Sequence, residues 1–345
     1  MSYTNGLDKP SDYFNTKLYT GNGSTNAITG VGFQPDFVWL KSRVNTTTDH
    51  KLFDAVRQSP NFISSNLNIA EAATSYFSGF QSDGFTVTGN NGQYNSNTDT
   101  FASWNWLANG TGSANTDGSI SSTVSANTTA GFSIVKWTGT GSNANIGHGL
   151  GVVPKMIIVK RLNNVEDWTV YHASLGNTNK IDLNNTGATS AVANIWNNTT
   201  PTSSLFYVGD HGRVNASGDT YVAYAFAEKT GYSKFGSYIG NGNADGTFVY
   251  TGFKPAWVMT KQTSGGNHWH IHDNKRNPFN VVGKNLKADS SNAEEDPAGG
   301  ENSRDFLSNG FKFRNADHNN SNGQTYIYMA FAEVPLVGDN PATAR

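Results

Sequence analysis

Three histidines stand at alternate positions in the segment HWHIHDN, residues 268 to 274. Alternate side chains of a β-strand leave the same face, so His268, His270 and His272 would lie side by side in a strand. Imidazoles at that spacing can approach one Zn²⁺ or Ni²⁺ ion. A metal site at these three residues is therefore one hypothesis, and a row of histidines facing solvent or an interface is the other.

Carboxylates are the next side chains with catalytic potential, because glycoside hydrolysis requires two of them on opposite sides of a bond. The candidates are Glu71, Glu166, Asp167, Asp273, Glu294, Glu295 and Asp296. None recurs as a paired strand signature, and residues 294–296 lie in a Gly/Pro/Ser-rich stretch typical of a solvated turn. The chain also lacks a nucleophile elbow, a P-loop, an H-E-x-x-H motif and cysteine. We therefore expect no catalytic residue, no cofactor and no enzymatic activity.

The elements that would position these residues belong to a pattern that occurs three times along the chain. Each occurrence has glycine, proline three residues later, and an apolar run that ends in lysine. The segments are GFQPDFVWLKSR (32–43), GVVPKMIIVKRL (151–162) and GFKPAWVMTKQT (252–263), with Pro35, Pro154 and Pro255 and with Lys41, Lys160 and Lys261. The runs are apolar at nearly every step, which predicts a central strand covered on both faces.

A second signature closes each copy. The segments are TFASWNWLAN from Thr100, TYVAYAFAEK from Thr220 and TYIYMAFAEV from Thr325, with Trp106, Phe226 and Phe331 at equivalent positions. Large apolar residues alternate along them, which predicts a half-buried antiparallel strand. Together these patterns predict an all-β chain of three tandem, divergent β-sandwich repeats of the jelly-roll or lectin-like kind. We expect repeats at 1–112, 131–230 and 231–345, with 113–130 as a linker that is either flexible or an extended connection.

Two features of the repeats bear on the candidate sites. The lysines that end the strands are expected to snorkel, with the stem on the core and the ammonium group at the rim; a repeated site for an acidic ligand is the alternative. Aligning the copies on their prolines places WHIHD opposite WTVYH and HKLFD. His270 then corresponds to Thr169 and Lys51, and His272 to Tyr171 and Phe53, so two copies build this strand without histidine. The metal hypothesis is weakened accordingly.

Composition narrows the classes of partner. Only 14% of the 345 residues are charged and the net charge is −2, so the chain offers no basic surface for nucleic acid. No window reaches the roughly 18 apolar residues that a membrane helix requires, and the first residues do not resemble a signal peptide. We expect neither membrane insertion nor export.

The segments NGLDKPSDYFNTKLYTGNG, GVGFQPDFVWLKSR, HKLFDAVR, SDGFTVTG and TFASWNW resemble a repeated β-domain of unknown function. That domain is found in tail-fibre-like and other structural proteins of marine bacteriophages. The resemblance implies a virion component, made in the host cytoplasm, with other virion proteins as partners and without catalytic residues. It covers nearly the whole chain and is most specific in the first copy.

Three hypotheses for the function remain open, and the first is the leading one. The first is a tail-fibre or tail-appendage subunit that contacts the host surface, with a surface glycan as partner. The second is a capsid decoration or cement protein, and the third is a polysaccharide depolymerase. Assembly has two alternatives: a homotrimer, or three units around a pseudo-three-fold axis within one chain.

Overall fold

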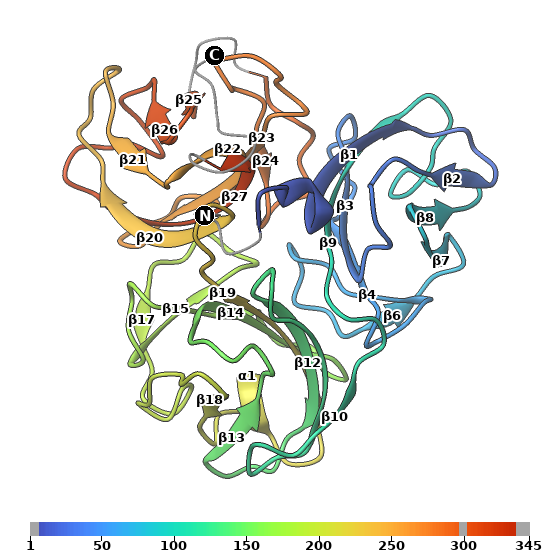
Figure 1. Ribbon diagram of the computed structural model, residues 1–345, viewed down its shortest axis with the longest axis vertical. Helices are drawn as coiled ribbons and strands as arrows, with labels where there is room; N and C mark the ends of the chain where they lie inside the picture. The colour runs from blue at the N-terminus through green and yellow to red at the C-terminus, as the bar shows by residue number, and fades with distance from the viewer. Residues whose placement is uncertain (1–6, 297–301, 336–345) are drawn as a thin grey trace.

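The computed structural model describes residues 7–296 and 302–335 as an almost entirely β protein (Figure 1). Its helical segments are η1 (Pro10–Asp12) and α1 (Gly212–Asn215). All pairings between the named strands are antiparallel. None of the described helices has the length and apolar character needed to cross a membrane.

Three large sheets form the inner part of the molecule. The first has the order β1 (Phe14–Thr20), β9 (Thr100–Trp106), β3 (Phe37–Ser42), β4 (Lys51–Asp54). The second has the order β10 (Ser113–Asn115), β11 (Ser122–Asn127), β12 (Phe132–Thr138), β19 (Thr220–Ala227), β14 (Pro154–Arg161), β15 (Thr169–His172), β16 (Asn179–Asp182), β17 (Ser190–Ala191). The third has the order β20 (Ser233–Ile239), β27 (Thr325–Pro335), β22 (Phe253–Gln262), β23 (His270–Asp273), β24 (Leu286–Lys287).

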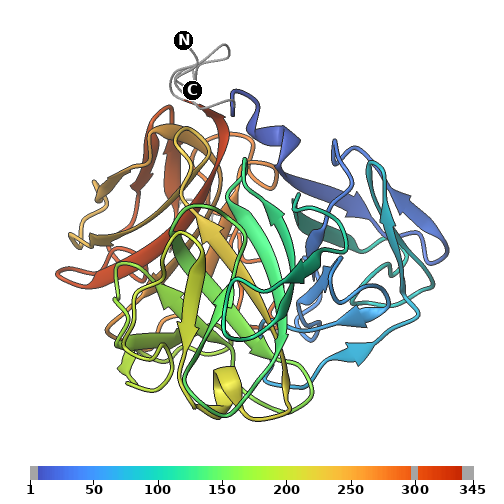
Figure 2. The same ribbon diagram turned by 60° about the horizontal axis from the view of Figure 1, so that its bottom comes forward.

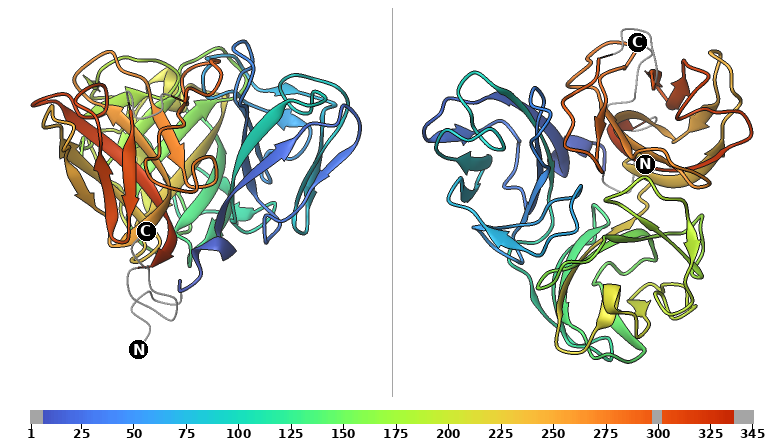
Figure 3. Two further views of the ribbon diagram at one scale, coloured as in Figure 1. Left: turned by 90° about the horizontal axis from the view of Figure 1, so that it is seen from above. Right: turned by 180° about the vertical axis from the view of Figure 1, so that it is seen from behind.

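Smaller sheets cover the outer side of the large ones. Their strands are β2 (Asn26–Ile28), β8 (Gly84–Val87) and β7 (Phe77–Gln81); β13 (Ala144–Gly147) and β18 (Leu205–Val208); β21 (Phe248–Tyr250), β26 (Gly310–Phe313) and β25 (Arg304–Leu307); and β5 (Asn61–Phe62) with β6 (Ala72–Ala73). We name the strands β1–β9 lobe 1, β10–β19 with α1 lobe 2, and β20–β27 lobe 3. The three lobes surround a common centre in the front and rear views (Figures 1 and 3).

The centre is filled by side chains from the inner faces of all three large sheets. Trp104 and Trp106 of lobe 1, Tyr224 of lobe 2, and Trp257 and Phe331 of lobe 3 belong to one buried apolar cluster. The opposite face of each large sheet packs on its own small sheet, in three separate clusters. Alternation of side chains along a strand produces this division, because neighbouring residues point to opposite faces.

The prediction of a central strand covered on both faces is confirmed, and the prediction of half-buried closing strands is wrong. All six residues of β3 are buried. In β9 the residues between the large apolar ones are buried too, including Ser103 and Asn105. Asn105 Nδ2 donates to the carbonyl of Asn15, which satisfies a polar group on the face that sequence alone assigns to solvent.

The segment predicted to be a linker also differs. Residues 113–130 contain β10 and β11, and β11 pairs with β12 over six residues. These strands extend the large sheet of lobe 2, where Val124 joins the buried cluster of that lobe. In the view from below, this extension runs along the side of lobe 2 that faces lobe 1 (Figure 2). The segment is rich in Ser, Thr and Asn because it forms the edge of a sheet, not because it is a linker.

Candidate functional site

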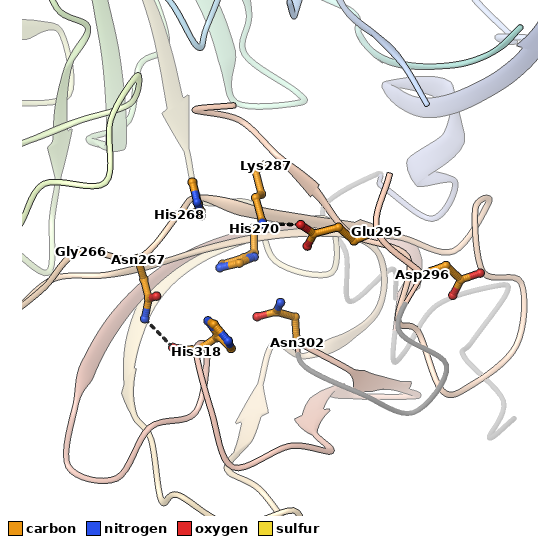
Figure 4. Close-up of a pocket in the computed structure, with 9 residues that line it drawn as sticks. All are labelled: Gly266, Asn267, His268, His270, Lys287, Glu295, Asp296, Asn302 and His318. Atoms are coloured by element: carbon orange, nitrogen blue, oxygen red, sulfur yellow. Dashed lines mark hydrogen bonds and ion pairs between the residues drawn. The ribbon is translucent and has the colours of Figure 1, made fainter. Parts of the chain in front are cut away.

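A polar pocket of about 660 Å³ opens in lobe 3 beside β23 (Figure 4). Its lining side chains come from segments distant in sequence, which the edge of the large sheet and two loops bring together. The lining consists of Gly266, Asn267, His268, His270, Lys287, Glu295, Asp296, Asn302 and His318. Histidines, amides and carboxylates dominate it, so the pocket suits a ligand that forms several hydrogen bonds.

His268 stands at the mouth of the pocket with a fixed orientation. Its Nδ1 lies 2.8 Å from Oδ2 of Asp289, and Asp289 Oδ1 accepts a hydrogen bond from the backbone N–H of Trp269 at 2.9 Å. The Asp289 side chain is 1% exposed, whereas that of His268 is 36% exposed. A buried carboxylate that orients a partly exposed imidazole leaves Nε2 of His268 directed away from Asp289.

His270 lies deeper and is buried. Its Nδ1 is 3.0 Å from Nδ2 of Asn285, and the same Nδ2 is 3.2 Å from Glu295 Oε2. The carboxylate requires an N–H at that amide position, so Asn285 donates to Nδ1 and the neutral ring carries its proton on Nε2. Burial, and after it the positive charge of Arg304, holds the pKa of His270 well below its ordinary value. His270 therefore presents an N–H donor, and within the described residues this Nε2 has no hydrogen-bond partner.

This geometry does not favour the metal hypothesis. The lone pair of His270 Nδ1 is occupied and its Nε2 carries hydrogen, so neither nitrogen is free to coordinate an ion. His272 is fully buried in the interior of lobe 3 and does not line the pocket. Within residues 7–296 and 302–335, no group of three or more His, Asp or Glu side chains is arranged to hold a metal. The expectation that His270 and His272 face solvent or an interface is also wrong, because both are enclosed between the two sheets of their lobe.

The three repeat lysines occupy equivalent positions, but they do not snorkel. Lys41, Lys160 and Lys261 are 0% exposed, and burial lowers the pKa of each to about 8. Each Nζ donates to a backbone carbonyl of the neighbouring lobe: Lys41 to Ser291 at 3.2 Å, Lys160 to Asn68 at 3.4 Å and Lys261 to Thr186 at 3.0 Å. We call these three contacts the lysine seam. It joins lobe 1 to 3, 2 to 1 and 3 to 2, which closes a ring.

Ring N–H groups follow the same path around the centre. Trp168 Nε1 of lobe 2 donates to Ser64 O of lobe 1 at 2.9 Å. Trp269 Nε1 of lobe 3 donates to Asp182 O of lobe 2 at 2.8 Å. In lobe 1 the corresponding contact is made by His50, whose Nε2 lies 2.9 Å from a lobe 3 carbonyl. In each lobe, therefore, the residue just before β4, β15 or β23 donates a hydrogen bond across the junction to the neighbouring lobe.

Two buried ion pairs, which sequence analysis missed, add to these junctions. Asp54 with Arg57 in lobe 1 and Asp273 with Arg276 in lobe 3 have fully buried side chains. The shared spacing of three residues was a signal in the sequence. Trp104 Nε1 of lobe 1 donates to Asp273 Oδ2 at 3.1 Å, so the pair in lobe 3 also contacts lobe 1.

Glu294 is part of the same network. Its carboxylate binds Arg43 of lobe 1 at 2.7 Å and Arg276 at 3.2 Å. Its side chain is only 8% exposed. The prediction that residues 294–296 form a solvated acidic turn is therefore wrong for Glu294, because two arginines neutralise it at a junction between lobes.

The remaining repeat anchors are three aromatic residues, which are buried in the centre, and three prolines, which lie within or just before strands. Trp106, Phe226 and Phe331 are buried and meet in the centre as a triangle, with ring centroids 5.6 to 6.3 Å apart. Pro154 and Pro255 lie at irregularities in the pairing of β14 and β22. A proline that donates no ladder hydrogen bond is tolerated at such positions. Pro35 is buried two residues before β3.

Comparison with known protein families gives a match over nearly the whole chain. A family model described as Domain of unknown function (DUF7483) matches residues 9–335. The match spans nearly the whole chain, so the protein belongs to this uncharacterised family. No curated protein matches it.

Proposed function

With membership of this uncharacterised family as the premise, we propose that the chain is a non-enzymatic structural protein of a bacteriophage particle. It consists of three divergent β-sandwich units that close around a pseudo-three-fold centre. The observation that carries the structural role is the ring of equivalent contacts between lobes, with the aromatic triangle at its middle. The phage assignment rests on the sequence resemblance described above.

Strand order supports three related units. In each large sheet the first strand of the unit pairs with the closing strand, which pairs with the proline-lysine strand and then with the following strand. These orders are β1-β9-β3-β4, β12-β19-β14-β15 and β20-β27-β22-β23. We assign the units to the ranges 1–112, 131–230 and 231–345, with β10 and β11 as an added margin of the second.

The use of charged groups supports a structural role. The repeat lysines, Arg57 and Arg276 are the buried cations at the junctions, and each is bound to a carbonyl or carboxylate of the protein itself. Side chains engaged in such contacts hold the three lobes together and are not free to transfer protons to a substrate. A particle that must survive outside the cell benefits from this rigidity.

Contact with a host surface is the role we favour, as a tail-fibre or tail-appendage subunit. Phe248 and Tyr250 alternate on β21, the edge strand of an outer sheet, and are 43% and 57% exposed. They leave the same face of the strand. Two exposed aromatic rings side by side offer flat apolar surfaces of the kind that stack on sugar rings. A surface glycan is thus the partner we assign to this face.

A head decoration protein is the second candidate, and the ring of lobes is the observation that favours it. Three units related by a pseudo-three-fold axis could cover a local three-fold position of a capsid as one chain. In that role the chain would bind other virion proteins and no receptor.

Labelling intact particles with an antibody against this protein, followed by negative-stain microscopy, separates these roles. Label on tail appendages would support the host-contacting subunit, and label over the head would support decoration. Particles without label would reject both. Loss of glycan viscosity on adding the purified protein would instead revive the depolymerase.

Light scattering tests the closed ring. Because the junctions are satisfied within one chain, we expect a particle of 37.1 kDa at micromolar concentration. A stable particle of three times that mass would show that the units also associate between chains.

A further inference from the structure

The interior of lobe 3 departs from that of lobe 1 at two facing positions. In lobe 1, Phe53 of β4 stacks on Phe77 of β7 with ring centroids 3.8 Å apart and planes 8° apart. Strand register identifies their counterparts. Phe53 pairs with the second residue of β3, Val38, as His272 pairs with Val258 of β22. Phe77 pairs with Val87, the last residue of β8. In the same way, Arg304 pairs with Phe313, the last residue of β26. An apolar stack in lobe 1 is thus replaced by an imidazole and a guanidinium in lobe 3.

Arg304 is a buried cation without an acceptor. It is 0% exposed, and its guanidinium lies over the ring of Phe313, 5.0 Å from the centroid. Its Nε, Nη1 and Nη2 have no hydrogen-bond partner among residues 7–296 and 302–335. Burial lowers the pKa of Arg304 to about 10, which still leaves it charged at neutral pH. A buried charge of this kind costs several kcal/mol unless something neutralises it.

Two imidazoles accompany Arg304 and also lack acceptors. Both ring nitrogens of His272 and Nε2 of His270 are buried and unpartnered within the described part of the chain. Burial first, and then the charge of Arg304, holds the pKa of each ring well below its ordinary value. The strand register places His272 and Arg304 at the positions where Phe53 and Phe77 stack in lobe 1, and His270 lies two residues before His272 on the same face of β23. Neutral imidazoles beside a guanidinium supply N–H donors and no negative charge.

The polar pocket adjoins this cluster at His270, while His272 and Arg304 lie behind its wall and are fully buried. His270 lines the pocket, and so does Asn302, two residues before Arg304. The acids around the pocket have partners of their own: Asp289 binds His268 and the N–H of Trp269, Glu295 binds Lys287 and Asn285, and Asp296 lies 3.8 Å from Lys284. The cluster is therefore rich in donors and poor in acceptors, and His270 is its member at the wall of the open pocket.

We propose that lobe 3 contains an oxyanion-binding site in which Arg304, His272 and Nε2–H of His270 hold a carboxylate or phosphate group that enters through the polar pocket. A guanidinium with adjacent N–H donors is the arrangement that proteins use for such groups. Lobe 1 cannot bind in this way, because Phe53 and Phe77 fill the same place. The proposal stands independently of the role in a phage particle.

Thermal unfolding of the full chain in the presence of anions tests the site. Acetate, inorganic phosphate and galacturonate are titrated at constant ionic strength made up with sodium chloride. Ligands that bind only the folded state raise the Tm with a saturable dependence on concentration. We expect a rise of roughly 3 °C at a hundredfold excess over Kd for at least one of them. A response to phosphate alone would assign a phosphate ester, one to acetate and galacturonate a carboxylate, and a stronger response to galacturonate an acidic sugar.

Two variants locate the effect. The double variant His272→Phe/Arg304→Phe installs the aromatic pair of lobe 1, and we expect it to fold and to lose the response. Arg314→Gln removes an arginine of the same lobe that is 39% exposed, and it should respond like the wild type. The wild-type titration requires no variant to fold. Absence of a saturable rise with all three anions, or an equal rise in the double variant, would overturn the proposal.

Discussion

Single residues at the junctions explain how three lobes of modest size share one core. Each repeat lysine is fully buried, yet its ammonium group has carbonyl partners in its own lobe and in the next one. Hydrogen bonds to carbonyl oxygens compensate part of the free-energy cost of removing the ammonium group from water. The compensation is incomplete, so the pKa of each lysine falls to about 8. The lysine seam is thus sensitive to pH in a range where most proteins are not.

The lysine seam predicts that stability rises with pH between about 8 and 10. In the unfolded chain these lysines keep their protons up to the ordinary pKa of about 10.5, whereas in the folded chain they begin to lose them near pH 8. The unfolded state therefore binds more protons in this window, and the free energy of unfolding increases with pH. Below pH 8 the cost of the buried charge is present in full. Urea unfolding at intervals across the window measures the slope.

Substitution of one lysine identifies the source of that slope. Lys160→Met removes one of three equivalent groups and should lower the slope by at most about a third, because burial also lowers the pKa of Lys51 and of Lys229. Lys234→Met is the matched control, because that side chain is 36% exposed on β20, the edge strand of the large sheet of lobe 3. An unchanged slope in Lys160→Met would show that the lysine seam does not titrate in this range.

The ion pair in lobe 3 makes a second prediction at the residue scale. Arg276→Met leaves Asp273 and Glu294 at the junction without this counter-charge, so we expect a loss of about 3–5 kcal/mol in the free energy of unfolding. Lys9→Met breaks an ion pair whose side chains are 68% and 49% exposed, and it should cost less than about 1 kcal/mol. Chemical denaturation measures both. Equal losses would mean that the buried pair adds nothing beyond a surface contact.

At the scale of elements, the hairpin of β10 and β11 tests whether residues 113–130 belong to the sheet. Val124→Asp would bury a carboxylate in the cluster under the sheet of lobe 2, and we expect it to cost at least about 2 kcal/mol. Ala114→Asp places the same group on the exposed side of the partner strand, where it should be nearly neutral. Thermal unfolding of both variants gives the comparison. A neutral Val124→Asp would return the segment to the status of a linker.

The errors of sequence analysis at this scale have a common cause. The proline-lysine strands and the anchors Trp106, Phe226 and Phe331 were predictable, because apolar continuity and internal spacing report burial directly. The alternation of the closing strands assigns Ser103 and Asn105 to the solvent face, but both are buried, and the Nδ2 group of Asn105 donates to two backbone carbonyls inside the protein. Polarity alone does not separate an exposed face from a buried face that carries its own partners.

The pocket was beyond prediction for a different reason. Its character depends on which distant segments meet beside β23. His270 acquires its tautomer from Asn285, and its neutral state in part from Arg304, 34 positions away in the chain. Spacing along one strand suggested a metal, whereas contacts between strands make the same histidine a hydrogen-bond donor.

At the scale of the whole molecule, the shared centre makes the lobes interdependent. Trp106 of lobe 1 contacts Phe132 and Phe226 of lobe 2 and Trp257 and Phe331 of lobe 3. No lobe could separate without exposing these rings to water. The lobes are therefore expected to unfold together, unlike units joined only by surface contacts.

Trp106→Ala tests this interdependence. The substitution leaves a cavity where all three lobes meet, so we expect a loss of about 3–5 kcal/mol and still a single unfolding transition. The slowest backbone amides of β9, β19 and β27 should then exchange faster by a similar factor, about a hundredfold or more, although only β9 carries the substitution. Native-state hydrogen exchange measures each strand separately, with Val44→Ala, a 51% exposed side chain, as the control. Faster exchange confined to β9 and its neighbours in lobe 1 would show that the lobes are stable independently and that the central triangle is only a contact between them.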